Sequence, residues 1–219
     1  MFRPESIAMR RRRMVEDQLV HRRIADPRVI AAFGEVDRTQ FVPGELASRA
    51  YDDAPLPIGS GQTISQPYVV AVTVEALELR GDEHVLEIGT GSGYAAAILG
   101  ELARQVETVE RLGELADVAR ERLDRLGYAN VHVHHADGTR GWQAGAPYEA
   151  IAVAAGAPRP PRSLLAQLTI GGHLVLPHGE VERQRLTRIT RRGPDDYVEQ
   201  DLGDVRFVPL VGEEGWPAS

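Results

Sequence analysis

Residues 85–94 decide the fold, and they read VLEIGTGSGY. A short apolar run that carries one acid, Glu87, ends in three alternate glycines, Gly89, Gly91 and Gly93, and a segment of helical character follows. A strand, a glycine-rich turn and a helix in this order are typical of an open parallel α/β sheet, which binds ligands at the carboxyl ends of its strands. The spacing is GxGxG, whereas dinucleotide enzymes favour GxGxxG. The motif alone is therefore also compatible with a tight turn that binds nothing.

Strands and helices alternate along the chain around this motif. Short apolar runs predict five strands, at 84–88, 106–109, 131–135, 150–154 and 173–176. Apolar residues at helical spacing predict helices between them, at 94–103, 112–126 and 163–168. This order predicts a mostly parallel, doubly wound sheet with helices on both faces.

The N-terminal part of the chain has a different pattern. Apolar residues near helical spacing predict an amphipathic helix over 5–23. A second, short helix begins at Asp26-Pro27, an N-cap followed by a proline in the first turn. Residues 51–67 hold five prolines and glycines around polar residues. They predict a loop that carries polar groups.

The C-terminal part is expected to extend the sheet. Residues 185–189 and 205–211 read as two strands on either side of a turn at 193–196, which predicts an antiparallel hairpin at the sheet edge. The fold class is therefore α/β and Rossmann-like, with an N-terminal helical region. We expect a single domain over 1–219, which divides into an N-terminal part, 1–67, a ligand-binding core, 68–180, and C-terminal strands, 181–219.

Composition excludes several classes of protein. The chain has no cysteine, and all 25 of its basic residues are arginine. Disulfides, thiolate metal sites, Schiff-base lysines and the lysine of a phosphate-binding P-loop are therefore absent. A net charge of −7 argues against nucleic acid as a partner. The chain shows no signal-peptide pattern and no apolar run of about 18 residues, so we expect a cytoplasmic protein without membrane contact.

Acidic residues lie on, or directly after, the first three predicted strands. Glu110 ends the second strand 110 − 91 = 19 residues after Gly91, the spacing at which an acid meets the two hydroxyls of an adenosine ribose. Asp137-Gly138 follows the third strand. A carboxylate at Glu87, on the first strand, is costly unless it accepts hydrogen bonds or faces a cation. Together these groups indicate one bound nucleoside.

Two histidines raise the alternative of a metal site. His132 and His134 would share one face of the third predicted strand. No third ligand lies near them in the sequence, so an exposed or edge strand is the preferred interpretation. We expect no metal ion.

Longer stretches of sequence resemble a known family. Residues 87–93 are similar to the first motif of class I S-adenosylmethionine-dependent methyltransferases. Residues 56–67 (LPIGSGQTISQP), 141–142 (GW) and 206–210 (RFVPL) resemble protein-L-isoaspartate O-methyltransferases. The likeness runs from about residue 14 to residue 212, and the segment around 62–67 is more specific than the glycine motif, because other methyltransferases lack it.

The resemblance implies an activity and a cofactor. Members of this family move a methyl group from S-adenosylmethionine to the free α-carboxylate of L-isoaspartyl residues in damaged proteins, and they release S-adenosylhomocysteine. The ester then closes to a succinimide, whose hydrolysis restores some normal aspartate. The expected partners are isoaspartyl peptides and proteins, and the expected state is a monomer. A peptide carboxylate is already ionised at neutral pH, so the chain needs no strong general base.

The resemblance also implies roles for individual residues. Ser65 is the candidate catalytic residue, whose hydroxyl would orient the carboxylate. The candidate cofactor-binding residues are Glu87, Gly89, Thr90, Gly91, Gly93, Glu110, Asp137 and Gly138. The candidate substrate-binding residues are Gln62, Thr63, Ile64, Ser65 and Val208.

Three other functions remain open at this point. The first is a methyltransferase of the same fold that modifies an aspartate in one dedicated biosynthetic peptide. The second is a nicotinamide-dependent dehydrogenase, which would call for the GxGxxG spacing and a general acid. The third is a regulator that binds S-adenosylmethionine without catalysis, for which residues 62–67 would have no purpose.

Overall fold

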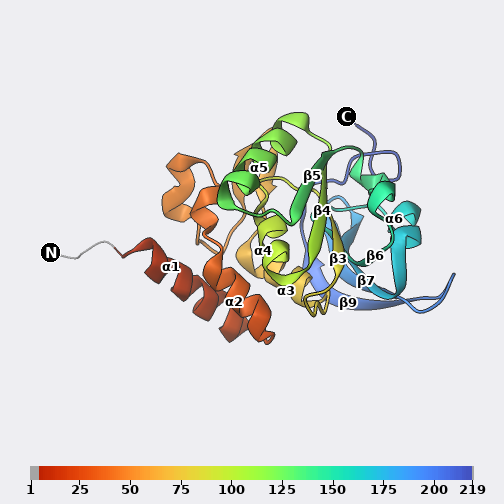
Figure 1. The fold of residues 1–219 in the computed structure, drawn as a ribbon, viewed down its shortest axis with the longest axis horizontal. Helices are drawn as coiled ribbons and strands as arrows, with labels where there is room; N and C mark the ends of the chain where they lie inside the picture. The colour runs from red at the N-terminus through yellow and green to blue at the C-terminus, as the bar shows by residue number, and fades with distance from the viewer. Residues whose placement is uncertain (1–4, 219) are drawn as a thin grey trace.

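The computed structural model describes residues 5–218, and its centre is a seven-stranded sheet with the order β5-β4-β3-β6-β7-β8-β9 (Figure 1). The strands are β3 (His84–Ile88), β4 (Gln105–Glu110), β5 (Val131–His135), β6 (Tyr148–Val153), β7 (Leu168–Glu180), β8 (Arg183–Arg191) and β9 (Tyr197–Val205). The first five strands in this order, β5, β4, β3, β6 and β7, pair in parallel. The last two, β8 and β9, continue the sheet as antiparallel strands. The predicted fold class is confirmed.

The helices begin and end at residues suited to those positions. They are α1 (Ile7–Met14), α2 (Pro27–Glu35), α3 (Pro67–Glu75), α4 (Tyr94–Leu102), α5 (Gly113–Leu126) and α6 (Arg162–Gln167). The predicted helix 5–23 is present as α1, continued by a π-helical turn and a 3-10 turn through Arg22. Asp26 caps α2 by accepting a hydrogen bond from the Arg28 amide, and Gly127, at φ 86°, ends α5. Short 3-10 turns are η3 (Arg38–Phe41), η4 (Gly44–Arg49), η5 (Gly138–Arg140) and η6 (Gln143–Gly145).

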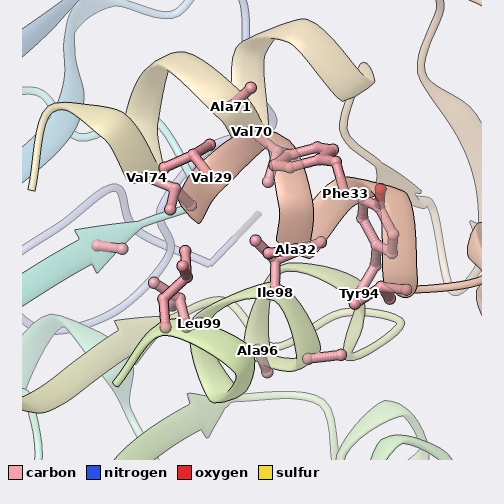
Figure 2. Packing of buried hydrophobic residues seen from close by; sticks show 14 of the residues in the cluster. Val29, Ala32, Phe33, Val70, Ala71, Val74, Tyr94, Ala96, Ile98 and Leu99 are labelled. Atoms are coloured by element: carbon pink, nitrogen blue, oxygen red, sulfur yellow. The ribbon is translucent and has the colours of Figure 1, made fainter. Parts of the chain in front are cut away.

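Buried apolar side chains form two clusters, one on each face of the sheet. Successive strand residues point to opposite faces, so Ala150 and Ala152 belong to the first cluster and Ile151 and Val153 to the second. In the first cluster α2, α3 and α4 meet, as Figure 2 shows. The side chains that point toward one another there include Val29, Phe33, Val70, Val74, Ile98 and Leu99. This packing fixes α3 and α4, whose N-terminal ends carry the loops described below.

Two sequence predictions are wrong. The predicted loop at 51–67 contains a small antiparallel hairpin, β1 (Leu56–Gly59) and β2 (Gln62–Ile64), with a register shift between Pro57 and Gly59. The last strand is β9 rather than 205–211. Most side chains of β9 are exposed, so the strand has little apolar pattern and is defined by its pairing with β8. The apolar run at 207–211 lines a cleft instead of pairing in the sheet.

Among residues 5–218, no helix combines the length and the apolar character that a membrane span needs.

Candidate active site

A cleft opens at the carboxyl ends of β3, β4 and β6, beside the point between β3 and β6 at which the strand order reverses. Its volume is about 1020 Å³, counting the part open to solvent. The glycine-rich loop, the β1–β2 hairpin, α3 and residues 207–211 form its walls. This is the place at which open α/β sheets bind ligands.

The glycine-rich loop has a backbone that only glycine adopts readily. Gly89, Gly91 and Gly93 all have positive φ angles, of 92°, 51° and 86°. A Cβ atom at Gly91 would lie 3.3 Å from Cδ1 of Ile58 in the facing hairpin. The loop and the hairpin therefore approach closely, and side chains on the loop would narrow the cleft between them. Thr90, inside the loop, lines the cleft and is buried.

Glu110 lies where its spacing from Gly91 predicts. Its Oε2 accepts a hydrogen bond of 2.9 Å from the Gly91 amide, and its Oε1 accepts one of 3.0 Å from the Leu112 amide. A carboxylate offers about four lone-pair sites, so two remain for a ligand. The side chain is buried and lines the cleft. This arrangement suits recognition of two neighbouring hydroxyl groups.

Glu87 is a buried acid with an unfilled hydrogen-bonding site. It is 1% exposed and lines the cleft. Its Oε2 accepts a hydrogen bond of 2.5 Å from Thr108, whereas Oε1 has no partner among residues 5–218. Burial, and to a lesser degree the charge of Glu110, raise the pKa of Glu87 to about 8, although the Thr108 hydroxyl opposes the shift. A positively charged ligand would favour the ionised form.

The raised pKa of Glu87 predicts a pH dependence of stability. In the unfolded chain, the Glu87 carboxyl group loses its proton as pH rises above a pKa of about 4.3. In the folded protein, the same group keeps its proton up to its higher pKa. Stability therefore falls as pH rises through this window. Between about pH 5.5 and 7.5 we expect the free energy of unfolding to fall by about 1.4 kcal/mol per pH unit more steeply in the wild type than in Glu87→Gln. Urea unfolding of both proteins across this range measures the difference, and parallel curves would contradict it.

Asp137 uses its carboxylate inside the protein. Oδ1 accepts hydrogen bonds from the backbone amide and the hydroxyl of Thr139, and Oδ2 accepts one from the Glu213 amide. Asp137 thus caps η5 and holds the C-terminal segment. Gly138, the next residue, lines the cleft, whereas Asp137 is not among the residues of its wall. A direct role of Asp137 in cofactor binding stays a prediction.

The β1–β2 hairpin brings the predicted substrate-binding residues Gln62, Thr63, Ile64 and Ser65 to one wall of the cleft. Ile64 is 4% exposed and packs into the core, which anchors the hairpin. Ser65 follows β2, and its backbone carbonyl accepts a hydrogen bond of 2.7 Å from Nη2 of Arg38. Ser65 is half-buried.

A smaller hollow of about 370 Å³ adjoins the cleft. The two spaces share five wall residues, which are Thr63, Ser65, Ala154, Phe207 and Val208. The Val208 carbonyl accepts a hydrogen bond of 2.8 Å from the Gly156 amide, and the side-chain amide of Gln184 bonds both backbone groups of Phe207. These bonds hold residues 206–211 over the cleft without placing them in the sheet.

The structure adds wall residues that the sequence did not indicate. Val70, Thr73 and Val74 of α3 and Tyr94 of α4 line the cleft. The signal for α3 was Pro67, because a proline that follows a polar residue is common in the first turn of a helix. Pro67 also fits the end of the predicted loop 51–67, so its pattern alone does not reveal the helix.

Comparison with known proteins assigns the family. The family described as protein-L-isoaspartate (D-aspartate) O-methyltransferase (PCMT) has a sequence model that matches residues 9–215. The chain belongs to this family. The resemblance inferred from residues 56–67, 141–142 and 206–210 is confirmed.

Individual relatives agree with the PCMT family. The chain is 58% identical, over 204 residues, to a protein-L-isoaspartate O-methyltransferase of Rhodopseudomonas palustris, covering 93% of this chain and 94% of the relative. A similar enzyme of Marinobacter nauticus is 57% identical over 208 residues, which cover 94% and 95% of the two chains.

Solved structures of PCMT proteins have the same fold. A protein-L-isoaspartate O-methyltransferase superimposes with a TM-score of 0.84 at 28% identity, covering 94% of this chain and 67% of the other. A second structure, described as a PCMT from Plasmodium falciparum in complex with S-adenosyl-L-homocysteine, has a TM-score of 0.79 at 26% identity and covers 90% and 96% of the two chains.

Proposed function

We propose that the chain transfers a methyl group from S-adenosylmethionine to the free α-carboxylate of L-isoaspartyl residues in damaged proteins and peptides. The observation that carries this proposal is the position of Ser65 and Val208, which line both the cleft and the adjoining hollow. A peptide in the hollow would reach a cofactor in the cleft along the wall that these two residues share with Thr63, Ala154 and Phe207. The names of the PCMT relatives and the S-adenosylhomocysteine complex of one of them support the reaction.

The residues of the cleft fit S-adenosylmethionine. Glu110 keeps two acceptor sites for the ribose hydroxyls beyond the two backbone amides that it already binds. Glu87 offers a buried carboxylate oxygen that has no partner within the described residues, which suits a ligand that carries positive charge. The positive φ angles of the glycine-rich loop favour glycine, and the missing side chains at Gly89 and Gly91 leave space in the cleft.

The main catalytic task of the protein would be to align the substrate carboxylate with the methyl group of the cofactor. When bound, S-adenosylmethionine supplies a methyl group activated by a positively charged sulfur. The Ser65 hydroxyl would hold the substrate carboxylate by a hydrogen bond, so that one carboxylate oxygen lies in line with that methyl group. The walls formed by Ile64 and Val208 would remove water from the carboxylate, which strengthens it as a nucleophile. Since the carboxylate is ionised at neutral pH, no side chain has to remove a proton.

One assay tests the proposed function. Methyl transfer from labelled S-adenosylmethionine is measured to an isoaspartyl peptide and to the aspartyl peptide of the same sequence. We expect label in the isoaspartyl peptide, and little in its twin, whose side-chain carboxyl lies on a different backbone path. Equal labelling of the two peptides would contradict the proposal. If neither peptide were labelled, a dedicated peptide substrate would be favoured instead.

We expect the activity to be independent of metal ions. Among residues 5–218, no group of three or more histidine, aspartate and glutamate side chains is arranged to hold a metal ion. His134 contacts Glu107 and stacks on Trp142 at 3.9 Å between ring centres. A carboxylate nucleophile also needs no Lewis acid to form. Dialysis against a chelator should leave the rate within about twofold. A loss that one divalent ion restores would refute this prediction.

A further inference from the structure

Arg38 is a charged side chain in the interior of the protein. It lies in η3, directly after the cap residue Asp37, and is 0% exposed. A buried charge is costly unless hydrogen bonds compensate it. The hydrogen bonds of Arg38 run to backbone carbonyls: Nε donates to Ala50 at 2.7 Å, and Nη2 donates to Ser65 at 2.7 Å. The free-energy cost of burying this charge therefore has to be explained by the two backbone segments that these hydrogen bonds hold in place.

The guanidinium group joins two segments that are distant in the sequence. Its planar fork presents donors at fixed angles, so it sets the position of the Ser65 backbone relative to Ala50 more firmly than a flexible ammonium group could. Ser65 has no strand partner of its own, because the register of β2 ends at Ile64. Arg38 thus supplies a backbone constraint at the residue where the hairpin's pairing stops.

The same guanidinium group contacts the cofactor side of the cleft. It lies over the ring of Tyr94, 4.7 Å from the ring centre. Tyr94 is the first residue of α4 and follows Gly93, the last glycine of the loop. The Tyr94 ring is also held by edge contacts with Phe33 and Phe41, at 6.1 and 5.5 Å between ring centres. Arg38 therefore touches the segment that carries Ser65 on one side and the start of α4 on the other.

We propose that Arg38 is a positioning residue, which fixes the Ser65 backbone relative to the glycine-rich loop so that the substrate carboxylate and the cofactor meet in line. The inference rests on the proposed function. Arg38 itself lies outside the walls of both the cleft and the hollow, so it acts through Ser65 and Tyr94 and not by touching a ligand. Its loss is expected to lower kcat and to leave cofactor affinity unchanged, because misplacement by about 1 Å costs roughly 100-fold in rate.

The chain contains a matched control in Arg28. This arginine also bridges two backbone carbonyls, donating from Nη1 to Leu79 at 2.8 Å and from Nη2 to Leu102 at 2.9 Å. Neither carbonyl belongs to a wall of the cleft. Arg28→Lys therefore removes the same kind of guanidinium bridge between two carbonyls, but away from the residues expected to align substrate and cofactor.

The experiment compares Arg38→Lys and Arg28→Lys in the full chain. We expect Arg38→Lys to lower kcat for an isoaspartyl peptide about 10- to 100-fold, with the Kd for S-adenosylhomocysteine within about twofold, and Arg28→Lys to keep both values within about twofold. Thermal unfolding shows whether the two variants lose similar stability. In a Ser65→Ala background, Arg38→Lys should lower kcat by less than about threefold, because the two changes act on one interaction.

The outcomes separate the inference from the proposed function. If the wild type does not methylate the isoaspartyl peptide, the proposed function fails first. Two results with an active wild type would overturn the inference. In the first, Arg38→Lys folds and keeps the wild-type kcat. In the second, Arg28→Lys lowers kcat as much as Arg38→Lys does. Arg38→Gln, which buries no charge, serves if Arg38→Lys does not fold. Failure of both variants to fold would also overturn the inference, because Arg38 would then support the whole fold.

Discussion

Replacing Ser65 by alanine is expected to lower methyl transfer to an isoaspartyl peptide about 10- to 100-fold while S-adenosylhomocysteine affinity stays almost unchanged. The hydroxyl is a single hydrogen-bonding group, and its loss alone costs about 0.5 to 1.5 kcal/mol. A carboxylate that is held loosely also spends less time in line with the methyl group, and misalignment costs up to roughly 100-fold in rate. The expected loss lies between these limits. Steady-state kinetics with the peptide and calorimetric titration with S-adenosylhomocysteine measure the two quantities.

Ser60→Ala is the control for this change. Ser60 lies in the turn of the same hairpin but is not part of the cleft wall. We expect it to keep wild-type activity. If Ser65→Ala loses cofactor binding together with activity, Ser65 supports the cofactor site or the fold, and the role given to its hydroxyl is wrong.

Replacing Glu110 by glutamine is expected to weaken S-adenosylhomocysteine binding about 10- to 100-fold. Each hydrogen bond from a hydroxyl to a carboxylate contributes about 1.5 to 3 kcal/mol, and an amide keeps only one oxygen to accept. The structure adds a second reason. Both carboxylate oxygens already accept backbone amides, from Gly91 and Leu112, and the NH2 group of glutamine would face one of these donors. The glycine-rich loop would therefore also lose part of its support.

Glu114→Gln is the matched control, because Glu114 lies four residues later, is exposed and stands outside the cleft wall. Calorimetric titration of both variants gives the comparison. A Kd that Glu110→Gln leaves unchanged would show that Glu110 serves the loop and not the ribose. A similar weakening in Glu114→Gln would mean that the charge of the region matters more than the contact.

The core of the fold was predictable, and so was the part of the cleft formed by the glycine-rich loop and Glu110, because local patterns define them. The apolar run before Gly89 is a central strand, and central parallel strands are recognised by such runs. The 19-residue spacing placed Glu110 beside Gly91, and the structure has the hydrogen bond between them. Asp137 shows the limit of this reasoning, since its carboxylate bonds Thr139 and Glu213. The C-terminal contact with Glu213 leaves no local signal at residue 137.

The part of the cleft formed by the β1–β2 hairpin and residues 207–211 was harder to predict, because tertiary contacts define it. The β1–β2 hairpin pairs only a few residues, and its prolines and glycines give the pattern of a loop. The strand β9 depends on pairing with β8. Hydrophobic patterning does not identify Arg38, because it treats every arginine as a surface residue. The partners of Arg38, Ala50 and Ser65, come close to it only in the complete fold.

The most direct test of the account is the fate of the isoaspartyl peptide itself. The peptide is incubated with the protein and S-adenosylmethionine, and chromatography follows the isoaspartyl peptide, its methyl ester, the succinimide and the aspartyl peptide over time. The account predicts that the α-carboxyl methyl ester forms first, that the succinimide follows with release of methanol, and that the aspartyl peptide accumulates. A methyl group that enters the aspartyl peptide equally well, or an isoaspartyl peptide that remains unmethylated, would contradict it.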